Sequence, residues 1–267
     1  MTGYIDVNSF LGEWPSRRLN GSPPPPRLEL VSQRLTLMDR LGIERAAISL
    51  LEGVWLKDSG TANDELHQLI RGHTDRCFPV YTLNPTFPTW REHLDRCVAS
   101  YGLTRGAGAV RLLPGYHGYA LDAAGDCLDR LTELSVPVLL TIQLEDARMQ
   151  HPGMRVPDVK PDAIFDAIQR RPELRWLVVN CLSTQIIAIC KQLPEDAQAW
   201  FDIARVQGPL ECVRLLRDQA SARRLVFGTN LPLHVPHSPV MELADARLSP
   251  EEDALIRSGN ARTALGI

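Results

Sequence analysis

The chain has 267 residues, of which 44% are hydrophobic and 23% charged, and its formal net charge is −3. This balance is ordinary for a soluble globular protein and does not favour nucleic acid or an anionic membrane as a partner. The six cysteines are scattered without a Cys-x-x-Cys pair, and no run approaches the roughly 18 apolar residues of a membrane span. We therefore expect a cytoplasmic protein with reduced thiols and no signal peptide, folded as one domain over residues 1–267.

Short apolar stretches alternate with amphipathic stretches along the whole chain. The expected strands are residues 4–7, 45–51, 78–83, 107–112, 136–142, 176–180, 200–203 and 225–228. Helical spacing is expected over residues 27–41, 62–75, 90–101, 122–134, 161–170, 184–192, 209–218, 239–246 and 250–258, and residues 12–26 form a long proline-rich loop. Nearly continuous apolar strands are typical of a parallel sheet covered on both faces. Eight such units predict a closed (β/α)8 TIM barrel, an α/β fold of about 250 residues.

Polar residues follow most of these strands, and a barrel would gather them at the carboxyl ends of its strands. We predict that they form a substrate pocket. The predicted substrate-binding residues are Asp6, Asn8, Arg111, Gln143, Arg148, Asn180, Arg205 and Asn230, with Glu52, Asn84, Cys181 and Asp202 at equivalent positions. The alternative is that they cap the following helices or bind water at the rim.

The loop at residues 145–151 combines two carboxylates, a guanidinium and an imidazole within seven residues. Glu145 or Asp146 could orient His151 as a general base, while Arg148 or Arg111 holds an anionic substrate. The alternative is a surface loop held by salt bridges. A second imidazole follows the fourth strand, so the predicted catalytic residues are Glu145, Asp146, His151 and His117. A serine hydrolase is unsupported, because the chain has no Gly-x-Ser-x-Gly.

Segments at the two ends of the chain resemble one known family. Residues 224–232 read Arg-Leu-Val-Phe-Gly-Thr-Asn-Leu-Pro and are followed by Gly-Asn-Ala at 259–261. They resemble the last strand, Phe-Gly-Ser/Thr-Asp-x-Pro, and the tail, Gly-Asn-Ala-x-Arg, of the amidohydrolase-related (amidohydrolase 2) proteins. Residues 5–12, Ile-Asp-Val-Asn-Ser-Phe-Leu-Gly, resemble their first strand, Ile-Asp-x-His-x-His-x-Gly. The resemblance covers essentially the whole chain and implies an amidohydrolase-like TIM barrel of the metal-dependent hydrolase superfamily.

The resemblance also implies a divergent member, because the family's metal-binding residues are replaced. Its first-strand histidines correspond to Asn8 and Phe10, its fifth-strand histidine falls near Thr141, its sixth-strand histidine near Cys181, and its last-strand aspartate on Asn230. A metal hydrolase needs imidazoles and a carboxylate to hold its ion. We therefore expect a degenerate site with no metal ligands and no cofactor, although zinc or another divalent metal is usual in the family.

Two functions follow from this combination of fold and site. The first is an amidohydrolase-like enzyme that hydrolyses or decarboxylates a small anionic molecule at an atypical or metal-free site. The alternative is a non-catalytic protein that binds a small molecule or a protein partner on a decayed hydrolase barrel. We expect a small anionic substrate and neither nucleic acid nor a membrane as partner. The tryptophan-bearing loops could support a homo-oligomer.

Overall fold

The computed structural model describes residues 3–14, 29–150, 155–206 and 211–267. Eight parallel strands form one sheet in the order of the sequence. They are β1 (Tyr4–Leu11), β2 (Ile43–Leu50), β3 (Cys77–Leu83), β4 (Ala109–Leu112), β5 (Val138–Thr141), β6 (Trp176–Val179), β7 (Ala199–Asp202) and β8 (Leu225–Val226). Backbone bonds then join β1 to the segment that follows β8: Val7 N donates to Phe227 O at 3.0 Å and Phe10 N to Leu231 O at 2.7 Å. The predicted TIM barrel is confirmed.

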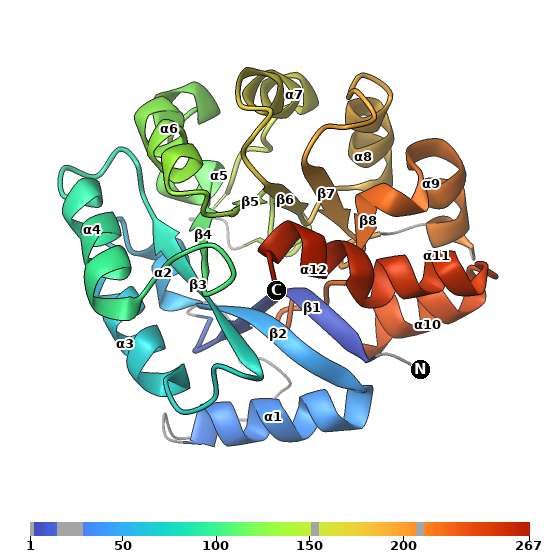
Figure 1. Cartoon of the computed structure of the whole chain (residues 1–267), viewed down its shortest axis with the longest axis horizontal. Helices are drawn as coiled ribbons and strands as arrows, with labels where there is room; N and C mark the ends of the chain where they lie inside the picture. Colours follow the sequence, from blue (N-terminus) through green and yellow to red (C-terminus); the bar gives the residue numbers. More distant parts are fainter. Residues whose placement is uncertain (1–2, 15–28, 151–154, 207–210) are drawn as a thin grey trace.

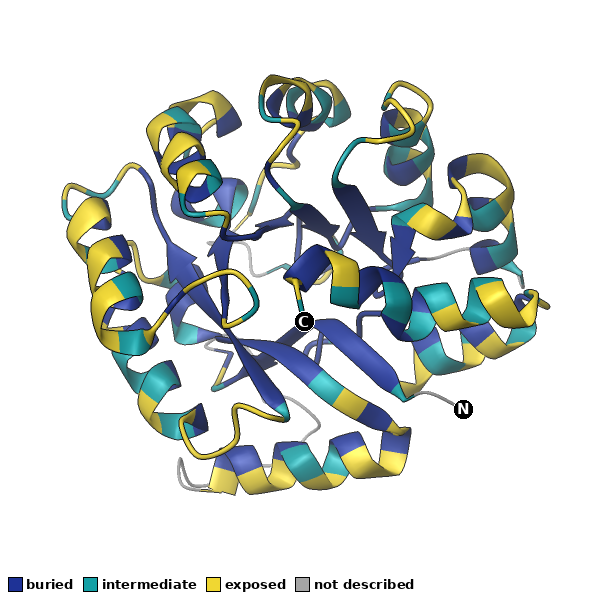
Figure 2. Cartoon of the chain, in the orientation of Figure 1, coloured by how far each residue is buried: buried dark blue, intermediate teal, exposed yellow. Residues whose placement is uncertain are grey.

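Helices surround the barrel (Figure 1). They are α1 (Leu30–Leu41), α2 (Glu52–Trp55), α3 (Gly60–Ile70), α4 (Trp90–Tyr101), α5 (Pro114–His117), α6 (Gly125–Glu133), α7 (Pro161–Arg170), α8 (Ser183–Cys190), α9 (Cys212–Ala220), α10 (His237–Asp245), α11 (Pro250–Ala254) and α12 (Asn260–Leu265). Figure 2 shows buried strands and helices whose outer faces are exposed. No helix within the described ranges has the length and apolar character of a membrane span.

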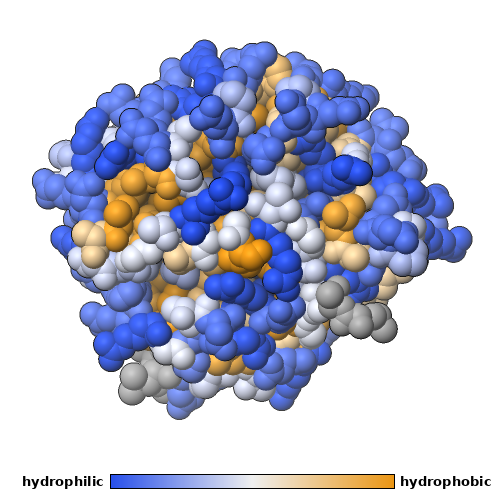
Figure 3. Space-filling view, viewed as in Figure 1, coloured by the Kyte–Doolittle hydropathy of each residue, from blue (hydrophilic) through white to orange (hydrophobic). Residues whose placement is uncertain are grey.

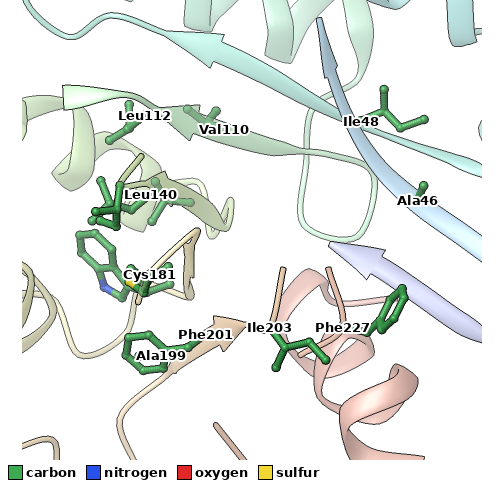
Figure 4. Packing of buried hydrophobic residues seen from close by; sticks show 14 of the residues in the cluster. Ala46, Ile48, Val110, Leu112, Leu140, Cys181, Ala199, Phe201, Ile203 and Phe227 are labelled. Atoms are coloured by element: carbon green, nitrogen blue, oxygen red, sulfur yellow. The ribbon is translucent and has the colours of Figure 1, made fainter. Parts of the chain in front are cut away.

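The helices and strands pack through one large apolar cluster. In this cluster, side chains on the outer face of the sheet meet the helices. Figure 4 shows part of the cluster, with Val110 and Leu112 on β4, Leu140 on β5 and Phe201 on β7. Alternation along each strand sends the intervening residues into the barrel.

A smaller apolar cluster fills the amino-terminal end of the barrel. It contains Ile5, Ala47, Phe78, Leu139 and Leu177 from the strands, together with Ala261, Ala264 and Leu265 of α12. In Figure 1 this helix lies across the barrel axis beside the C-terminus. The closed amino-terminal end leaves the opposite end as the place for a site.

The first strand is longer than expected and is irregular. It continues to Leu11, whereas the sequence predicted an end at Val7. Asp6 pairs with Ala46 but Ser9 pairs with Ile48, so β1 uses one residue more than β2 over this step. An extra residue of this kind shifts the alternation of side chains beyond it. Val7 belongs to the apolar cluster inside the barrel, and the next side chain, Asn8, also lies in the interior.

Candidate functional site

A polar layer lies inside the barrel between two apolar layers. We call it the central network: Asn8, Ser49, Arg111, Thr141, Asn180, Asp202 and Asn230, all 0% exposed. Below it is the apolar cluster at the amino-terminal end. Above it, a third cluster combines Phe10, Trp14, Leu51, Val54, Leu113, Leu144 and Leu233. The network is therefore shielded from water on both sides, and its electrostatic interactions are little screened.

Arg111 is the cation of the central network. Its Nε donates to Ser49 Oγ at 2.8 Å, and its Nη1 donates to Thr141 Oγ1 at 2.8 Å and to Asn8 Oδ1 at 3.1 Å. The Phe10 ring lies over the guanidinium, 4.2 Å from its carbon to the ring centroid. Burial lowers the pKa of Arg111 to about 9, while the charges of Asp202 and Asp6 act in the opposite direction. Among the described residues its Nη2 has no hydrogen-bond partner.

Three asparagines continue the network in one direction. Asn8 Nδ2 donates to Asp202 Oδ2 at 2.8 Å and to Asn180 Oδ1 at 2.7 Å. Asn180 Nδ2 then donates to Asn230 Oδ1 at 3.1 Å, and Asn230 Nδ2 donates to Leu144 O at 2.9 Å. The two ends of this series of hydrogen bonds fix the orientation of the amides. The Arg111 guanidinium at one end can only donate, and the Leu144 carbonyl oxygen at the other end can only accept. Amides are therefore required at these positions.

Local backbone geometry brings the three amides together. Asn180 and Asn230 have φ values of 63° and 53°, the left-handed region that asparagine tolerates better than most residues. Asn230 N also donates to Asn8 O at 2.7 Å, and Asn180 N to Asp202 Oδ1 at 2.7 Å. At Gly228 an added Cβ would lie 2.7 Å from Asp202 Oδ2 and 3.3 Å from Asn8 Cβ. Glycine is needed there because the backbone just beyond β8 passes so close to the central network.

Two buried carboxyl groups accompany the cation. Burial raises the pKa of Asp202 to about 7 and that of Asp6 to about 6. Asp6 accepts hydrogen bonds from Thr229 Oγ1 at 2.6 Å, from Thr229 N at 3.0 Å and from Asn8 N at 3.0 Å. These bonds join the first strand to the segment after the last one. Asp6 is therefore a residue of the barrel closure as well as of the polar interior.

We expect the free energy of unfolding to fall as the pH rises from about 5 to about 8. The pKa values of Asp6 and Asp202 are raised from 3.8 in both groups. The folded protein therefore keeps protons that the unfolded chain has released. This contribution is complete below the unfolded pKa and is lost as the pH passes through the folded values of about 6 and about 7. Together the two groups should lose about 4 kcal/mol of stabilisation between about pH 5 and about pH 8.

Urea unfolding at a series of pH values would test this expectation. Asp202→Asn should flatten the profile, because one of the two titrating groups is then absent. An unfolding free energy that stays constant or increases over the same pH interval would contradict the raised carboxyl pKa values.

A second polar group lies at the mouth of the barrel, beyond the carboxyl ends of β4, β5 and β7. We call it the mouth cluster: Tyr116, Gln143, Glu145 and Arg205. Gln143 and Glu145 are each 4% exposed and Arg205 is 5% exposed. Tyr116 Oη accepts a hydrogen bond from Leu144 N at 2.8 Å. Burial raises the pKa of Tyr116, the charge of Glu145 raises it further, and the charge of Arg205 lowers it. The phenol, the carboxylate and the guanidinium therefore lie close enough to interact.

Aromatic side chains adjoin the mouth cluster. The Trp14 and Tyr116 ring centroids are 6.4 Å apart, and those of Trp14 and Trp55 are 5.6 Å apart, both in edge-to-face geometry. Sequence reasoning did not select Tyr116, although its loop follows the predicted fourth strand. The mouth therefore combines apolar walls with a few buried polar groups, which is typical of small-molecule sites.

The predicted site residues are only partly brought together. Asp6, Asn8, Arg111, Asn180 and Asn230 meet through the central network, while Gln143, Glu145 and Arg205 lie at the mouth. His117 is buried, and its Nε2 lies 3.0 Å from Gly53 O, to which it can only donate. Burial also lowers the pKa of His117, which favours the neutral ring. In this geometry the side chain joins α5 to α2.

The remaining predicted residues belong to the loop after β5. Arg148 Nε and Nη2 donate to the Asp146 carboxylate at 3.0 and 2.9 Å, and the Arg148 side chain is 86% exposed. This pairing lowers the pKa of Asp146. The two side chains thus form the salt-bridged arrangement that the sequence left open as an alternative. His151 lies outside the described residues.

Asn180 and Cys181, which follow β6, lie on opposite sides of the barrel wall. The resemblance places the family's sixth-strand histidine near Cys181, whose thiol lies in the apolar cluster outside the barrel (Figure 4). Burial raises its pKa well above the ordinary value. Asn180 is the residue that faces the central network. Neighbouring residues of a strand point to opposite sides, so a shift of one residue exchanges the interior for the exterior.

Comparisons with known proteins identify one family and several similar solved structures. The model of a family described as Amidohydrolase matches residues 12–267. A solved 2,6-dihydroxybenzoate decarboxylase in complex with 2,6-dihydroxybenzoate is 16% identical, covers 100% of both chains and has a TM-score of 0.72. A dihydroxybenzoic acid decarboxylase from a Polaromonas species, with bound manganese and 2-nitroresorcinol, is 15% identical, with 100% of this chain and 97% of that chain covered and a TM-score of 0.70.

A hydrolase also has this fold. The structure of a probable 2-pyrone-4,6-dicarboxylic acid hydrolase from Acinetobacter baumannii, with citric acid bound, is 14% identical and has a TM-score of 0.66. The match covers 99% of this chain and 100% of that chain. No curated protein matches the chain. At these identities the solved structures establish the shared barrel.

The expectation of no cofactor is wrong for a protein of this type: manganese is bound in the Polaromonas structure and in a similar structure of 5-carboxyvanillate decarboxylase from Novosphingobium aromaticivorans. The central network does not fit such an ion as it stands. The amide oxygens of Asn8, Asn180 and Asn230 and both oxygens of Asp202 already accept hydrogen bonds from N–H groups. Within the described ranges, no three His, Cys, Asp or Glu residues are grouped to hold a metal. We therefore assign no step of the reaction to a metal.

Proposed function

The chain belongs to the amidohydrolase family, and from this premise we propose that it is an enzyme that hydrolyses or decarboxylates a small carboxylate-bearing molecule at the mouth of its barrel. The observation that carries the proposal is the pair of buried guanidinium groups above and below the apolar layer. Among the described residues, neither Arg205 Nε nor Arg111 Nη2 has a hydrogen-bond partner. A buried cationic donor without a partner favours an anionic ligand.

The mouth cluster supports a division of roles. Arg205 would bind the substrate carboxylate, because it is 5% exposed and lies where Tyr116 and Glu145 also converge. Arg111 would act from beneath as a fixed positive charge in surroundings of low dielectric constant. The apolar walls, which include Phe10, Leu113 and Leu144, would hold the organic part of the substrate.

Proton transfer is assigned to the carboxylate of the mouth cluster. Glu145 would carry the proton that hydrolysis or decarboxylation requires, with Tyr116 as a hydrogen-bond donor. The Tyr116 oxygen accepts from Leu144 N, so its own O–H is available to donate to another group. His151 remains a proposed partner for Glu145 on sequence grounds. The carboxylic acids named in two of the similar structures support this substrate class.

Turnover of a panel of carboxylic acids would test the proposal. Hydroxylated benzoates and lactones of dicarboxylic acids would be followed by proton NMR and carbon dioxide release, with and without added manganese. On an accepted substrate, Arg205→Gln should lower kcat/KM by about 100-fold, mainly through KM, because one charge-assisted contact is lost. Arg40→Gln, on the exposed face of α1, is the matched control. Equal kcat/KM values for Arg205→Gln and wild type would remove Arg205 from the site.

Non-catalytic binding is the second candidate function. It is favoured by the closed hydrogen bonding of Asn8, Asn180 and Asn230, because the resemblance places metal ligands at Asn8 and Asn230. Calorimetry with the same panel would separate the two functions. Saturable binding that needs Arg205, without product under either metal condition, would support the second function.

A further inference from the structure

A second candidate site lies at the opposite end of the barrel from the mouth. A cavity of about 300 Å³ opens beside the amino-terminal parts of β2 and β3 and the residues that precede β4. Its polar lining consists of Arg45, His67, Arg71, Thr74, Tyr81 and Tyr101. Figure 3 shows this end of the molecule, where the surface is mainly hydrophilic and hydrophobic residues form separate small areas.

The lining of this cavity carries positive charge without a carboxylate. Two of the nearby acidic residues are paired with other side chains. Glu44 accepts from Arg262 at 3.1 Å, and Asp64 accepts from Arg96 at 3.2 Å and from the Tyr101 hydroxyl. Within the described ranges, neither Arg45 nor Arg71 forms an ion pair. Glu44 and Asp75 affect Arg45 only through longer-range charge interactions.

Arg45 has a donor that no described residue satisfies. Its Nη2 donates to Thr74 O at 3.0 Å, and its guanidinium carbon lies 5.3 Å from the centroid of the Phe78 ring. Among the described residues, its buried Nε has no hydrogen-bond partner. Burial lowers the pKa of Arg45, and the charge of Arg262 lowers it further. An anion in the cavity would supply both the missing acceptor and the missing counter-charge.

His67 adds a third donor to the same lining. Its Nδ1 lies 3.2 Å from Tyr81 Oη, and its ring stacks on Tyr101 with centroids 4.4 Å apart. Burial raises the pKa of Tyr81, so the phenol stays protonated and can donate to Nδ1. When Nδ1 accepts this hydrogen bond, Nε2 carries the ring proton and is a donor. Arg45, Arg71 and His67 thus line one cavity and carry N–H groups that can donate to the same ligand.

We propose that this cavity binds a phosphate group, either as inorganic phosphate or as part of a small phosphomonoester. A phosphate dianion offers several strong acceptor oxygens, which suits two guanidinium groups and an imidazole N–H. The stacked ring of His67 and the position of Arg45 on a strand limit the conformational entropy lost on binding. The site is independent of the mouth and of the reaction proposed there.

Isothermal titration calorimetry of the full chain in low-salt buffer would test the proposal. Inorganic phosphate, glycerol 3-phosphate and chloride are the probes. Wild-type protein should bind phosphate with one site per chain, and Arg71→Gln should weaken binding about tenfold. Arg71 is exposed and forms no described ion pair, so this variant should fold. Tighter binding of glycerol 3-phosphate than of phosphate would identify a phosphomonoester as the ligand, and the reverse order would identify the free ion.

Two further variants complete the test. Arg45→Gln should abolish phosphate binding, and circular dichroism would confirm that it remains folded. Arg105→Gln removes the same charge from an exposed position beside the cavity and should leave the affinity unchanged. The proposal is overturned by absence of saturable phosphate binding, by equal losses in Arg71→Gln and Arg105→Gln, or by chloride competing as well as phosphate.

Discussion

Replacing Arg111 with methionine should lower the free energy of unfolding by about 4 kcal/mol at neutral pH. Methionine fills a similar volume but removes the guanidinium that donates to Asn8, Ser49 and Thr141. Asp202 and Asp6 would then lack a buried positive charge to balance their carboxylates. Burial already disfavours the charged form of both groups and raises their pKa values. Removing one partner of a buried charge arrangement costs more than the arrangement contributes, because the remaining charge cannot reach water.

Urea unfolding monitored by circular dichroism would measure this loss. Arg130→Met is the matched control, since Arg130 is exposed and pairs with Glu133 one turn away, so its loss should cost less than about 1 kcal/mol. Part of the loss in Arg111→Met should be recovered at about pH 5, because protonation of Asp202 removes the unbalanced charge. A loss equal to that of the control, or one that does not change with pH, would show that Arg111 contributes packing alone.

Replacing Asn230 with aspartate should lower the free energy of unfolding by about 3 kcal/mol, although it introduces the residue that the resemblance places there. Asn230 Nδ2 donates to Leu144 O at 2.9 Å, and a carboxylate oxygen at that position would face a carbonyl oxygen. The variant would also place a third buried carboxyl group in an interior that already holds Asp6 and Asp202. The loss should increase with pH as the new group ionises.

Thermal and urea unfolding at two pH values would test this prediction. Gln192→Glu makes the same amide-to-carboxylate change on an exposed side chain near the end of α8 and should change stability by less than about 0.5 kcal/mol. If Asn230→Asp were as stable as wild type at about pH 8, the three amides could reorient. The hydrogen bonds that link them would then have no fixed donor-to-acceptor direction.

Only some residues of the mouth cluster could be predicted from the sequence. Arg205 and Glu145 were expected there because each follows a strand, and a barrel places such residues together. Tyr116 was missed, because its position at the mouth depends on α5, from which its hydroxyl reaches Leu144 N. The salt bridge between Asp146 and Arg148 was one of two alternatives for a charge-rich loop, and only the structure shows that the two side chains face each other.

The sequence by itself determined the barrel and the family. Alternating apolar and amphipathic stretches are local properties, and eight of them in order leave few ways to bury every strand. The tertiary structure decided which polar side chains meet. The extra residue in β1 turns Asn8 inward, Asn180 rather than Cys181 faces the interior, and Arg111 supplies the cation between them. These outcomes depend on register and on hydrogen-bond partners up to 194 residues apart, which no local pattern specifies.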